Sequence, residues 1–272
     1  MLILAATPIG NLSDASPRLR DALTKAEHVA AEDTRTLKQL CGALEIKLHA
    51  KLYSLHEHNE SDRIQQLVDL ALTSDVLVVS DAGMPTISDP GFLLVREAAK
   101  QAVEIISIPG PSAVITALAV SGLPTDRFCF EGFLPRKSGE RKAVFSALLN
   151  EQRTMIFFEA PHRILDSLVD AVEVLGPERR ASVSRELTKK FEHTERGTLS
   201  DLVEWAKTEP KGEMVLVIAG AQPQAFDIDE LAAKASEMAK SGVRLKEACS
   251  DLAKEFGASS SAIYSAALKL KA

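Results

Sequence analysis

Residues 78–91 read Val-Val-Ser-Asp-Ala-Gly-Met-Pro-Thr-Ile-Ser-Asp-Pro-Gly, and this stretch decides the fold class that we expect. An apolar strand at 75–79 ends here in a long polar loop, after which a helix is predicted to begin near Pro90. In open α/β sheets, ligands lie just beyond the carboxyl ends of the strands. Loops of this length are more often functional than not, although an ordinary connection is the alternative.

Two more loops rich in Gly and Pro follow apolar strands. The strand at 2–6 runs into residues 7–12, and the strand at 103–108 runs into residues 109–113. In a parallel sheet the three loops would meet at one edge and form a binding cleft, whereas each loop alone would be an ordinary connection. The first loop lacks the Gly-x-Gly-x-x-Gly spacing of a dinucleotide site, and no Walker lysine loop is present in the sequence.

Apolar strands and amphipathic helices alternate over residues 1–121, which predicts a mainly parallel sheet covered by helices. The turn-forming segment 122–126 ends this pattern, and residues 122–222 are typical of an α+β domain with a mixed or antiparallel sheet. Residues 221–225 have the composition of a linker. Beyond them, residues 227–272 contain three helical patterns and a short Gly-containing turn, as in a helix-turn-helix. We therefore expect an α/β chain with domains at 1–121 and 122–222 and a helical tail at 227–272.

The composition excludes several classes of protein. A chain of 272 residues with a net charge of -6 is no general polycation, so any nucleic-acid contact must come from local basic patches. Cys41, Cys129 and Cys249 form neither a metal-ligand spacing nor a disulfide framework, which favours a reducing compartment. The first residues lack the basic region of a signal peptide, and no apolar run reaches the roughly 18 residues that span a bilayer. We expect a cytoplasmic protein with no metal site and no membrane contact.

Eight segments, in chain order, resemble the tetrapyrrole methylase superfamily. Within it they look like the branch that methylates a ribose 2′-hydroxyl of small-subunit ribosomal RNA. The segments are 7–12, 32–35, 81–91, 109–113, 128–135, 158–163, 185–189 and 211–215. The resemblance implies a mainly parallel N-terminal sheet, a mixed α+β second domain and a small helical C-terminal extension. It also implies S-adenosylmethionine held in the cleft between the two sheet domains, and a homodimer.

The resemblance assigns particular residues to the cofactor. The positions that match the family's contacts with S-adenosylmethionine are Pro8, Gly10, Asp81, Gly83, Pro85, Ile87, Ser112, Ala113, Glu159 and Gly197. The tetrapyrrole branch commonly has Gly-Gly-Asp-Pro in the second loop, where this chain has Ala-Gly-Met-Pro at 82–85. Asp81 is the acidic residue that could replace part of the missing contact.

An alcohol is a poor nucleophile at neutral pH, so methyl transfer to a ribose requires a general base or a polarising cation beside well-aligned reactants. Residues 32–35, Glu-Asp-Thr-Arg, follow a predicted strand and face the expected cleft. Asp33 is the candidate base and Arg35 the candidate phosphate ligand, although acidic residues also favour helix N-termini on electrostatic grounds alone. His162 is a further catalytic candidate because imidazole transfers protons near neutral pH, but a His at a helix start is more often structural.

The residues expected to contact RNA are mostly basic. Cations interleaved with Phe128, Phe130 and Phe133 suit single-stranded bases and phosphates, although the i, i+2 spacing of the first two also fits a core-facing strand. We expect the neighbouring cations to be available in either case; they are Arg127, Arg136, Lys137, Arg141 and Lys142. The helical tail is another candidate, with a small solvated cap as the alternative. The expected substrate contacts are Glu32, Arg136, Lys137, Arg163, Arg185, Glu186 and Lys189.

Together these observations favour a methyltransferase that uses S-adenosylmethionine to modify a ribose 2′-hydroxyl of a cytidine in small-subunit ribosomal RNA. The nearest alternative is a methyltransferase of the same superfamily that acts on a tetrapyrrole or a modified protein residue. In that case a tail that resembles a nucleic-acid module would be unexplained. An alternative of another class is a non-catalytic RNA-binding protein that senses S-adenosylmethionine.

Overall fold

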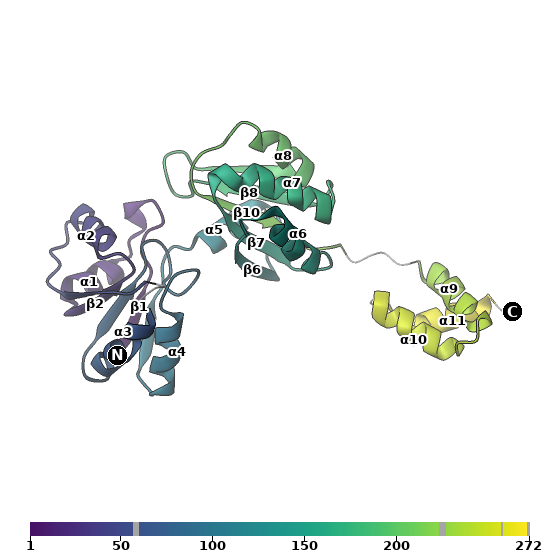
Figure 1. Cartoon of the computed structure of the whole chain (residues 1–272), viewed down its shortest axis with the longest axis horizontal. Helices are drawn as coiled ribbons and strands as arrows, with labels where there is room; N and C mark the ends of the chain where they lie inside the picture. The colour runs from purple at the N-terminus through teal and green to yellow at the C-terminus, as the bar shows by residue number, and fades with distance from the viewer. Residues whose placement is uncertain (57–59, 223–226, 257, 271–272) are drawn as a thin grey trace. The chain divides into compact units, whose positions relative to one another are not determined.

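The computed structural model describes residues 1–56, 60–222, 227–256 and 258–270 (Figure 1). The chain forms two compact units, residues 1–220 with two five-stranded sheets and residues 221–272 with helices. Within the described ranges, no helix combines the length and the apolar composition needed to cross a membrane.

The first sheet is entirely parallel, as the alternating pattern predicted. Its strands run in the order β3-β2-β4-β1-β5. Their bounds are β1 Leu2–Ala5, β2 His28–Ala31, β3 Lys51–Ser54, β4 Val76–Val79 and β5 Ile105–Ile108. The sequence pattern did not predict β3. This edge strand is short, and only Tyr53 of its four residues is buried, so it carries little hydrophobic signal.

Helices cover both faces of this sheet because its strand residues alternate between two cores. In β4, Val76 and Val78 pack with α3 (Glu60–Thr73) and α4 (Phe92–Lys100). Leu77 and Val79 point the other way and pack with α1 (Pro17–Lys25) and α2 (Thr34–Ala43). A short 3-10 helix, η1 (Leu12–Asp14), follows β1. Helix α4 begins two residues later than predicted, after Gly91, whose φ of 117° no side-chain-bearing residue adopts readily.

The second sheet is mixed, as predicted, with strand order β6-β7-β10-β8-β9. Only β6 and β7 are parallel, and the other neighbours are antiparallel. The strand bounds are β6 Phe128–Phe133, β7 Thr154–Glu159, β8 Arg180–Arg185, β9 His193–Thr198 and β10 Met214–Ile218. Strand β9 begins at His193, so Phe191 and Glu192 belong to the preceding loop.

The two faces of the second sheet are covered by different parts of the chain. Helices α6 (Ser138–Ala147), α7 (Ile164–Leu175) and α8 (Leu199–Ala206) share one core with the sheet. The 3-10 helix η2 (Pro161–Arg163) leads into α7. On the other face, α5 (Ala113–Ser121) packs Ala117 and Leu118 against Ile156 and Val217. Helix α5 therefore follows the βα series of the first sheet in sequence but packs on the second sheet. The domain boundary that we expect after Ser121 stays a prediction.

The described residues of the C-terminal unit form three helices, as the sequence predicted. They are α9 (Ile228–Lys240), α10 (Leu245–Phe256) and α11 (Ser260–Lys269). Leu231, Cys249, Leu252 and Ile263 form a shared core of their own. The predicted linker at 221–225 lies in part outside the described residues.

Candidate functional site

The three Gly- and Pro-rich loops meet at the carboxyl edge of the first sheet, which confirms that part of the sequence prediction. Thr7 and Gly83 form an isolated bridge, with N···O distances of 2.9 and 3.1 Å between their backbones. The Thr7 hydroxyl donates to the Ser80 carbonyl at 3.2 Å. A Cβ on Gly110 would lie 2.9 Å from the Cβ of Ala6, so glycine permits the third loop to approach the first.

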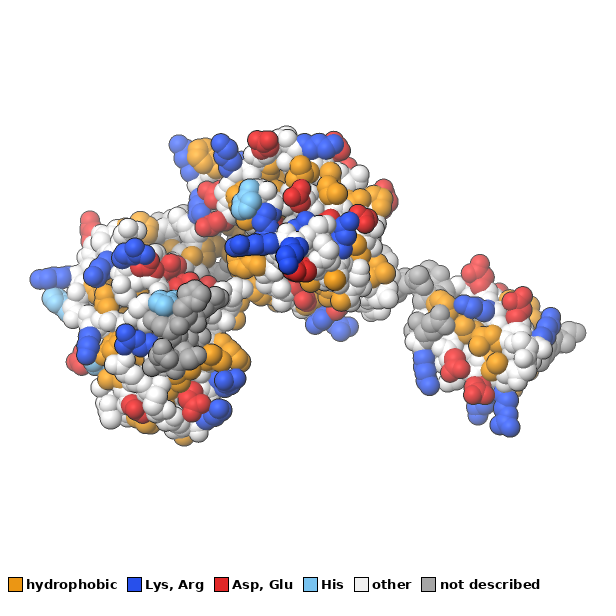
Figure 2. Space-filling view, viewed as in Figure 1, with side chains coloured by type: hydrophobic (Ala, Val, Ile, Leu, Met, Phe, Trp, Pro, Cys, Tyr) orange, Lys and Arg blue, Asp and Glu red, His pale blue; other side chains and the backbone are white. Residues whose placement is uncertain are grey.

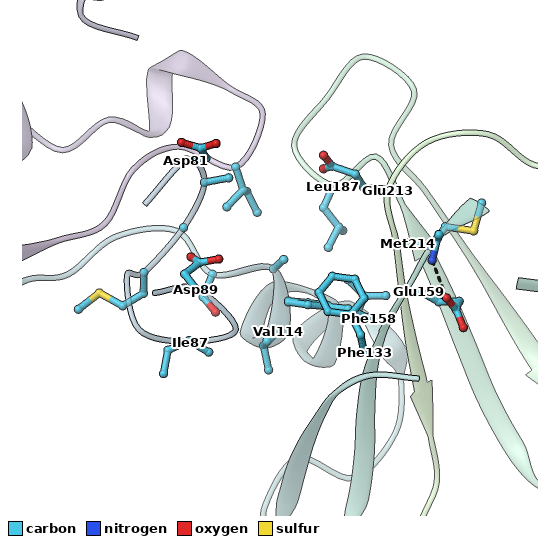
Figure 3. A pocket seen from close by; sticks show the side chains of 18 of the residues that line it. Asp81, Ile87, Asp89, Val114, Phe133, Phe158, Glu159, Leu187, Glu213 and Met214 are labelled. Carbon is cyan, nitrogen blue, oxygen red and sulfur yellow. Dashed lines mark hydrogen bonds between the residues drawn. The ribbon is translucent and has the colours of Figure 1, made fainter. Parts of the chain in front are cut away.

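A cavity of about 450 Å³ opens where these loops face the second sheet (Figure 3). This volume lies in the usual range for small-molecule sites. Asp81, Ile87 and Asp89 lie on the side of the first sheet, and Phe158 and Met214 lie on the opposite side. The complete lining is Ile9, Glu32, Asp81, Ala82, Gly83, Met84, Ile87, Asp89, Ser112, Ala113, Val114, Phe133, Phe158, Glu159, Ala160, Pro161, Leu187, Glu213, Met214 and Val215.

The structure brings seven of the twenty predicted site residues to this cavity. Those that line it are Glu32, Asp81, Gly83, Ile87, Ser112, Ala113 and Glu159. Those that do not line it are Pro8, Gly10, Asp33, Pro85, Arg136, Lys137, His162, Arg163, Arg185, Glu186, Lys189, Gly197 and Arg35. Several residues of the second group have a structural explanation instead.

Two of the predicted cofactor glycines are required by close packing. A Cβ on Gly10 would lie 2.5 Å from Cγ of Lys189, so the first loop touches the loop after β8. A Cβ on Gly197 would lie 2.8 Å from Oδ2 of Asp201, which caps α8 together with Thr198. Gly197 thus permits a helix cap and is not part of the cavity wall.

Asp33 is engaged by its own helix and not by the cavity. Its carboxylate accepts the backbone N–H of Arg35 at 2.7 Å and so caps the start of α2. The Arg35 guanidinium also binds it, with Nη2 2.7 Å from Oδ2. These hydrogen bonds lower the pKa of Asp33 to about 2. A carboxylate held this way is a weak base, so the geometry gives no support to Asp33 as the proton acceptor.

Arg163 is partly buried and supports the cavity wall from behind, so its side chain does not itself line the cavity. Its Nε lies 3.3 Å from Oε1 of Glu159, and Nη2 donates to the carbonyl of Pro135 at 2.9 Å. Ser167 donates to the other oxygen of Glu159 at 2.5 Å. Glu159 is therefore a fixed part of the wall. The neighbouring His162 is exposed and does not line the cavity.

We predicted that the basic residues near β6 are available to contact RNA. This prediction is wrong for Arg141, and an ion pair makes Lys142 less available. Arg141 is buried, with Nη2 2.6 Å from Oδ2 of Asp170, because the α6–α7 contact encloses the pair. Lys142 is ion-paired with Glu173 at 2.5 Å. Of the predicted substrate residues in this region, Arg136 and Lys137 are exposed.

The aromatic side chains of β6 are also arranged differently from a simple alternating strand. Phe128 is exposed, whereas Phe130 packs edge-on against Phe158 at a centroid distance of 4.9 Å. A break in the pairing register between Phe130 and Phe133 turns Phe133 to the same partner at 5.3 Å. Phe133 and Phe158 thereby form an aromatic wall of the cavity.

Sequence reasoning located the lining segments but not all of the lining side chains. Every lining residue except Val114 falls within one of the eight segments that resemble the family. Asp89 was passed over although it lies in the second loop. Burial and the negative charge of Glu32 raise the pKa of Asp89 to about 6, and Asp81 adds to the effect. Burial likewise raises the pKa of Asp81.

The family model of Tetrapyrrole (Corrin/Porphyrin) Methylases matches residues 1–203 of this chain. The chain belongs to the tetrapyrrole methylase family. Ribosomal RNA small subunit methyltransferase I of Mycobacterium tuberculosis is 48% identical to this methylase over 253 residues, which are 93% of this chain and 88% of that protein. The protein of the same name from Synechocystis is 42% identical over 277 residues, which are 100% and 99% of the two chains.

Among solved structures, uroporphyrin-III C-methyl transferase from Thermus thermophilus complexed with S-adenyl homocysteine has the same fold. It superposes on this methylase with a TM-score of 0.54 at 16% identity, over 80% of this chain and 96% of that one. This chain is an S-adenosylmethionine-dependent methyltransferase.

The cavity fits S-adenosylmethionine in size and in chemistry. The ligand is a sulfonium cation with an apolar adenine ring, and the cavity has an apolar wall that includes Phe158 and Met214 and a carboxylate wall that includes Asp81 and Asp89. The loops at 81–87 and 112–114 offer backbone groups for its polar atoms. Bound there, the cofactor supplies an activated methyl group. Among the described residues, no group of His, Cys, Asp and Glu side chains is arranged to hold a metal ion.

Proposed function

We propose that this methyltransferase modifies the ribose 2′-hydroxyl of a cytidine in small-subunit ribosomal RNA. The observation that carries the proposal is the extent of its similarity to proteins named for small-subunit ribosomal RNA. Those relatives are between 40% and 48% identical to it, and the match extends over as much as 100% of the chain. Solved structures that share its fold include a precorrin-6Y methylase at 19% identity and a uroporphyrin III C-methyl transferase at 14%.

The surface around the cavity supports a polyanionic acceptor. The Arg35 side chain is 85% exposed and follows the cavity residue Glu32 by three positions. Arg136 and Lys137 are exposed and follow the cavity residue Phe133. On the face drawn in Figure 2, basic and acidic side chains are interspersed over residues 1–220. Phosphate recognition would therefore rest on these individual cations, which fits the net charge of -6.

Exposed aromatic side chains add a second kind of RNA contact. Phe133 is 62% exposed although it also lines the cavity, so it presents a free ring face near the mouth. Phe191 is 62% exposed, and Nζ of Lys190 lies 5.5 Å from its ring centroid. Unstacked bases bind to such rings with little dependence on sequence. We propose that both rings contact bases beside the target nucleotide.

The C-terminal unit is proposed to contribute to the same substrate. Lys246, Lys254 and Lys269 are exposed on its helices, and Arg244 is exposed just before α10. The Lys234 ammonium instead lies over the Phe256 ring, 4.9 Å from the centroid. Charge reversal at Lys246 is expected to weaken binding of the ribosomal subunit and to leave cofactor binding unchanged.

The activity can be tested with methyl-labelled S-adenosylmethionine and small ribosomal subunits from cells that lack the gene. Free ribosomal RNA and a tetrapyrrole precursor serve as parallel acceptors, and labelled RNA is digested to nucleosides. Label in 2′-O-methylcytidine is expected. Label in a base, in another nucleoside or only in the tetrapyrrole would overturn the proposal. Cofactor binding with no label in any acceptor would favour a non-catalytic sensor.

We also propose a homodimer. Three large apolar side chains near the cavity are strongly exposed, namely Ile87 at 49%, Phe92 at 60% and Ile115 at 51%. If these side chains join into one apolar patch, that patch would be typical of an interaction surface. Light scattering of the purified protein should give twice the chain mass, and Phe92→Glu should shift it toward the monomer. A monomeric wild-type protein would refute this part of the proposal.

A further inference from the structure

The cavity carries charge of one sign. All of its ionisable lining side chains are carboxylates, and no lysine, arginine or histidine of the described residues is among them. The five acids are Glu32, Asp81, Asp89, Glu159 and Glu213. A cleft lined by one sign of charge concentrates ligands of the opposite sign. The walls therefore favour a cation.

Two of the five carboxylates are balanced by cations that stand outside the cavity. Glu159 is ion-paired with Arg163, with Nε and Oε1 separated by 3.3 Å. Glu213 is ion-paired with Lys189, with Nζ and Oε2 separated by 3.0 Å. Both pairs belong to the side of the second sheet, so this side contributes little net charge to the cavity.

The side of the first sheet is different. In the described part of the chain, no salt bridge includes Asp81 or Asp89. The Asp81 carboxylate accepts the Asp33 backbone N–H at 3.2 Å and the Thr36 hydroxyl at 3.4 Å. Arg35, the cation that acts on Asp81, is itself held by Asp33. Hydrogen bonds from neutral donors therefore dominate around Asp81.

Glu32 belongs to the same cluster, because its Oε2 accepts the backbone N–H of Asp81 at 3.3 Å. The mutual repulsion is visible at Asp89, where burial, Glu32 and Asp81 together raise the pKa and a hydrogen bond from Ser80 opposes them. Carboxylates under such repulsion are relieved when a cation binds beside them.

We propose that Asp81 and Asp89 make the cavity select the positively charged methyl donor over the uncharged thioether that remains after transfer. In the reaction the C–S bond breaks, its electron pair stays on sulfur, and the methyl carbon bonds to the acceptor oxygen, whose proton passes to solvent. The ligand thereby loses one positive charge while the carboxylates keep theirs. S-adenosylhomocysteine is then held less tightly than S-adenosylmethionine and is released. The inference rests on the cofactor of the family and not on the proposed RNA acceptor.

Binding calorimetry of the full chain without RNA tests this directly. The three probes are S-adenosylmethionine, S-adenosylhomocysteine and sinefungin, in which a protonated amine takes the place of the methylated sulfonium. At pH 7, Asp89→Asn is expected to raise the Kd of the two cationic ligands about tenfold and that of S-adenosylhomocysteine less than about twofold. Asp81→Asn should act in the same direction. Asp126→Asn, which removes an exposed aspartate that is not among the lining residues, is the matched control.

A change of pH offers a second readout. Between pH 7 and pH 5 the wild-type preference for sinefungin over S-adenosylhomocysteine should shrink, because Asp89 takes up a proton. Glu32 and Asp81 face the same space and contribute to the remaining pH dependence. In Asp89→Asn the preference should be smaller at pH 7 and should change less with pH.

If Asp89→Asn weakens the binding of all three ligands equally, Asp89 acts through the shape of the cavity or through hydrogen bonds and not through charge, and the proposal is overturned. Unchanged affinities for all three ligands would overturn it as well. A thermal melt of each variant checks that it is folded, and Asp81→Asn provides an independent case. Because the calorimetry contains no methyl acceptor, a failure of the RNA methylation assay would not affect its conclusion about donor selection. Equally, a failure of the donor-selection proposal would not affect the proposed RNA substrate.

Discussion

Asp89→Asn is expected to stabilise the protein at neutral pH while it weakens donor binding. Asp89 has its pKa raised from 3.8 to about 6 by burial and by the charges of Glu32 and Asp81. Since one pKa unit corresponds to about 1.4 kcal/mol, a shift of about two units sets an upper limit near 3 kcal/mol. Asp89 is only partly buried, so solvent screening reduces this to roughly 1.5 kcal/mol.

The sign follows from proton linkage. The folded state binds the Asp89 proton more tightly than the unfolded state, so this group favours folding in acid. That contribution is complete below about pH 4 and is lost as the pH rises through about 6. An asparagine has no charge to desolvate, so the gain of the variant over wild type should grow as the pH rises from 4.5 to 7.5.

Urea denaturation at these two pH values measures the effect. At pH 7.5 we expect Asp89→Asn to raise the free energy of unfolding by roughly 1.5 kcal/mol, and at pH 4.5 we expect a much smaller difference. Asp126→Asn controls for the general change in net charge. An equal effect at both pH values, or a loss of stability confined to pH 7.5, would refute the reasoning. A more stable variant with weaker donor binding would show that this site trades stability for function.

Three further substitutions test the structural explanations. Gly110→Ala should lower the free energy of unfolding by about 1–3 kcal/mol, because the new Cβ meets that of Ala6 at 2.9 Å, and Ala6→Gly should restore it in urea denaturation. Arg141→Met should cost about 3–5 kcal/mol in the same assay, because it leaves the buried Asp170 carboxylate with only the more distant Lys142, at 3.7 Å, as its cation; a loss below about 1 kcal/mol would contradict the enclosed pair. Asp33→Ala should keep kcat for methylation of the small ribosomal subunit within about threefold of wild type, and it should lower the melting temperature because α2 loses its cap. A loss of several orders of magnitude in kcat would instead identify Asp33 as the base.

The position of the cavity could be predicted from the sequence because its causes are local. Alternating apolar residues set the strands, and Gly and Pro at strand ends permit the turns between them. Parallel strands then bring their carboxyl ends to one edge, which is where Thr7 and Gly83 meet. For this reason the lining residues of the three loops, except Val114, fall in segments that the pattern indicates, whereas those on the side of the second sheet fall in segments that the family resemblance indicated.

The roles of individual side chains within those segments were much harder to predict. Asp33 and Glu32 are neighbours, yet the first caps a helix and the second lines the cavity. Arg163 was predicted to face the substrate, but it lies behind Glu159 and holds it in place. A pattern of charged residues predicts that a segment is polar, but it does not indicate where each charge is directed.

The sequence by itself determined the parallel first sheet, the mixed second sheet, the helical C-terminal unit and the segments that border the site. Only the tertiary structure decided which charges are paired, since the partners are distant in sequence. The ion-paired Arg141 and Asp170 are 29 positions apart, and the like-charged Asp81 and Glu32, whose contact is a backbone hydrogen bond, are 49 apart. Burial and Coulomb interactions depend on distances in space, and a linear pattern does not contain them. The placement of Asp81 and Asp89 in one cavity, with no salt bridge to either from the described residues, is therefore a property of the fold.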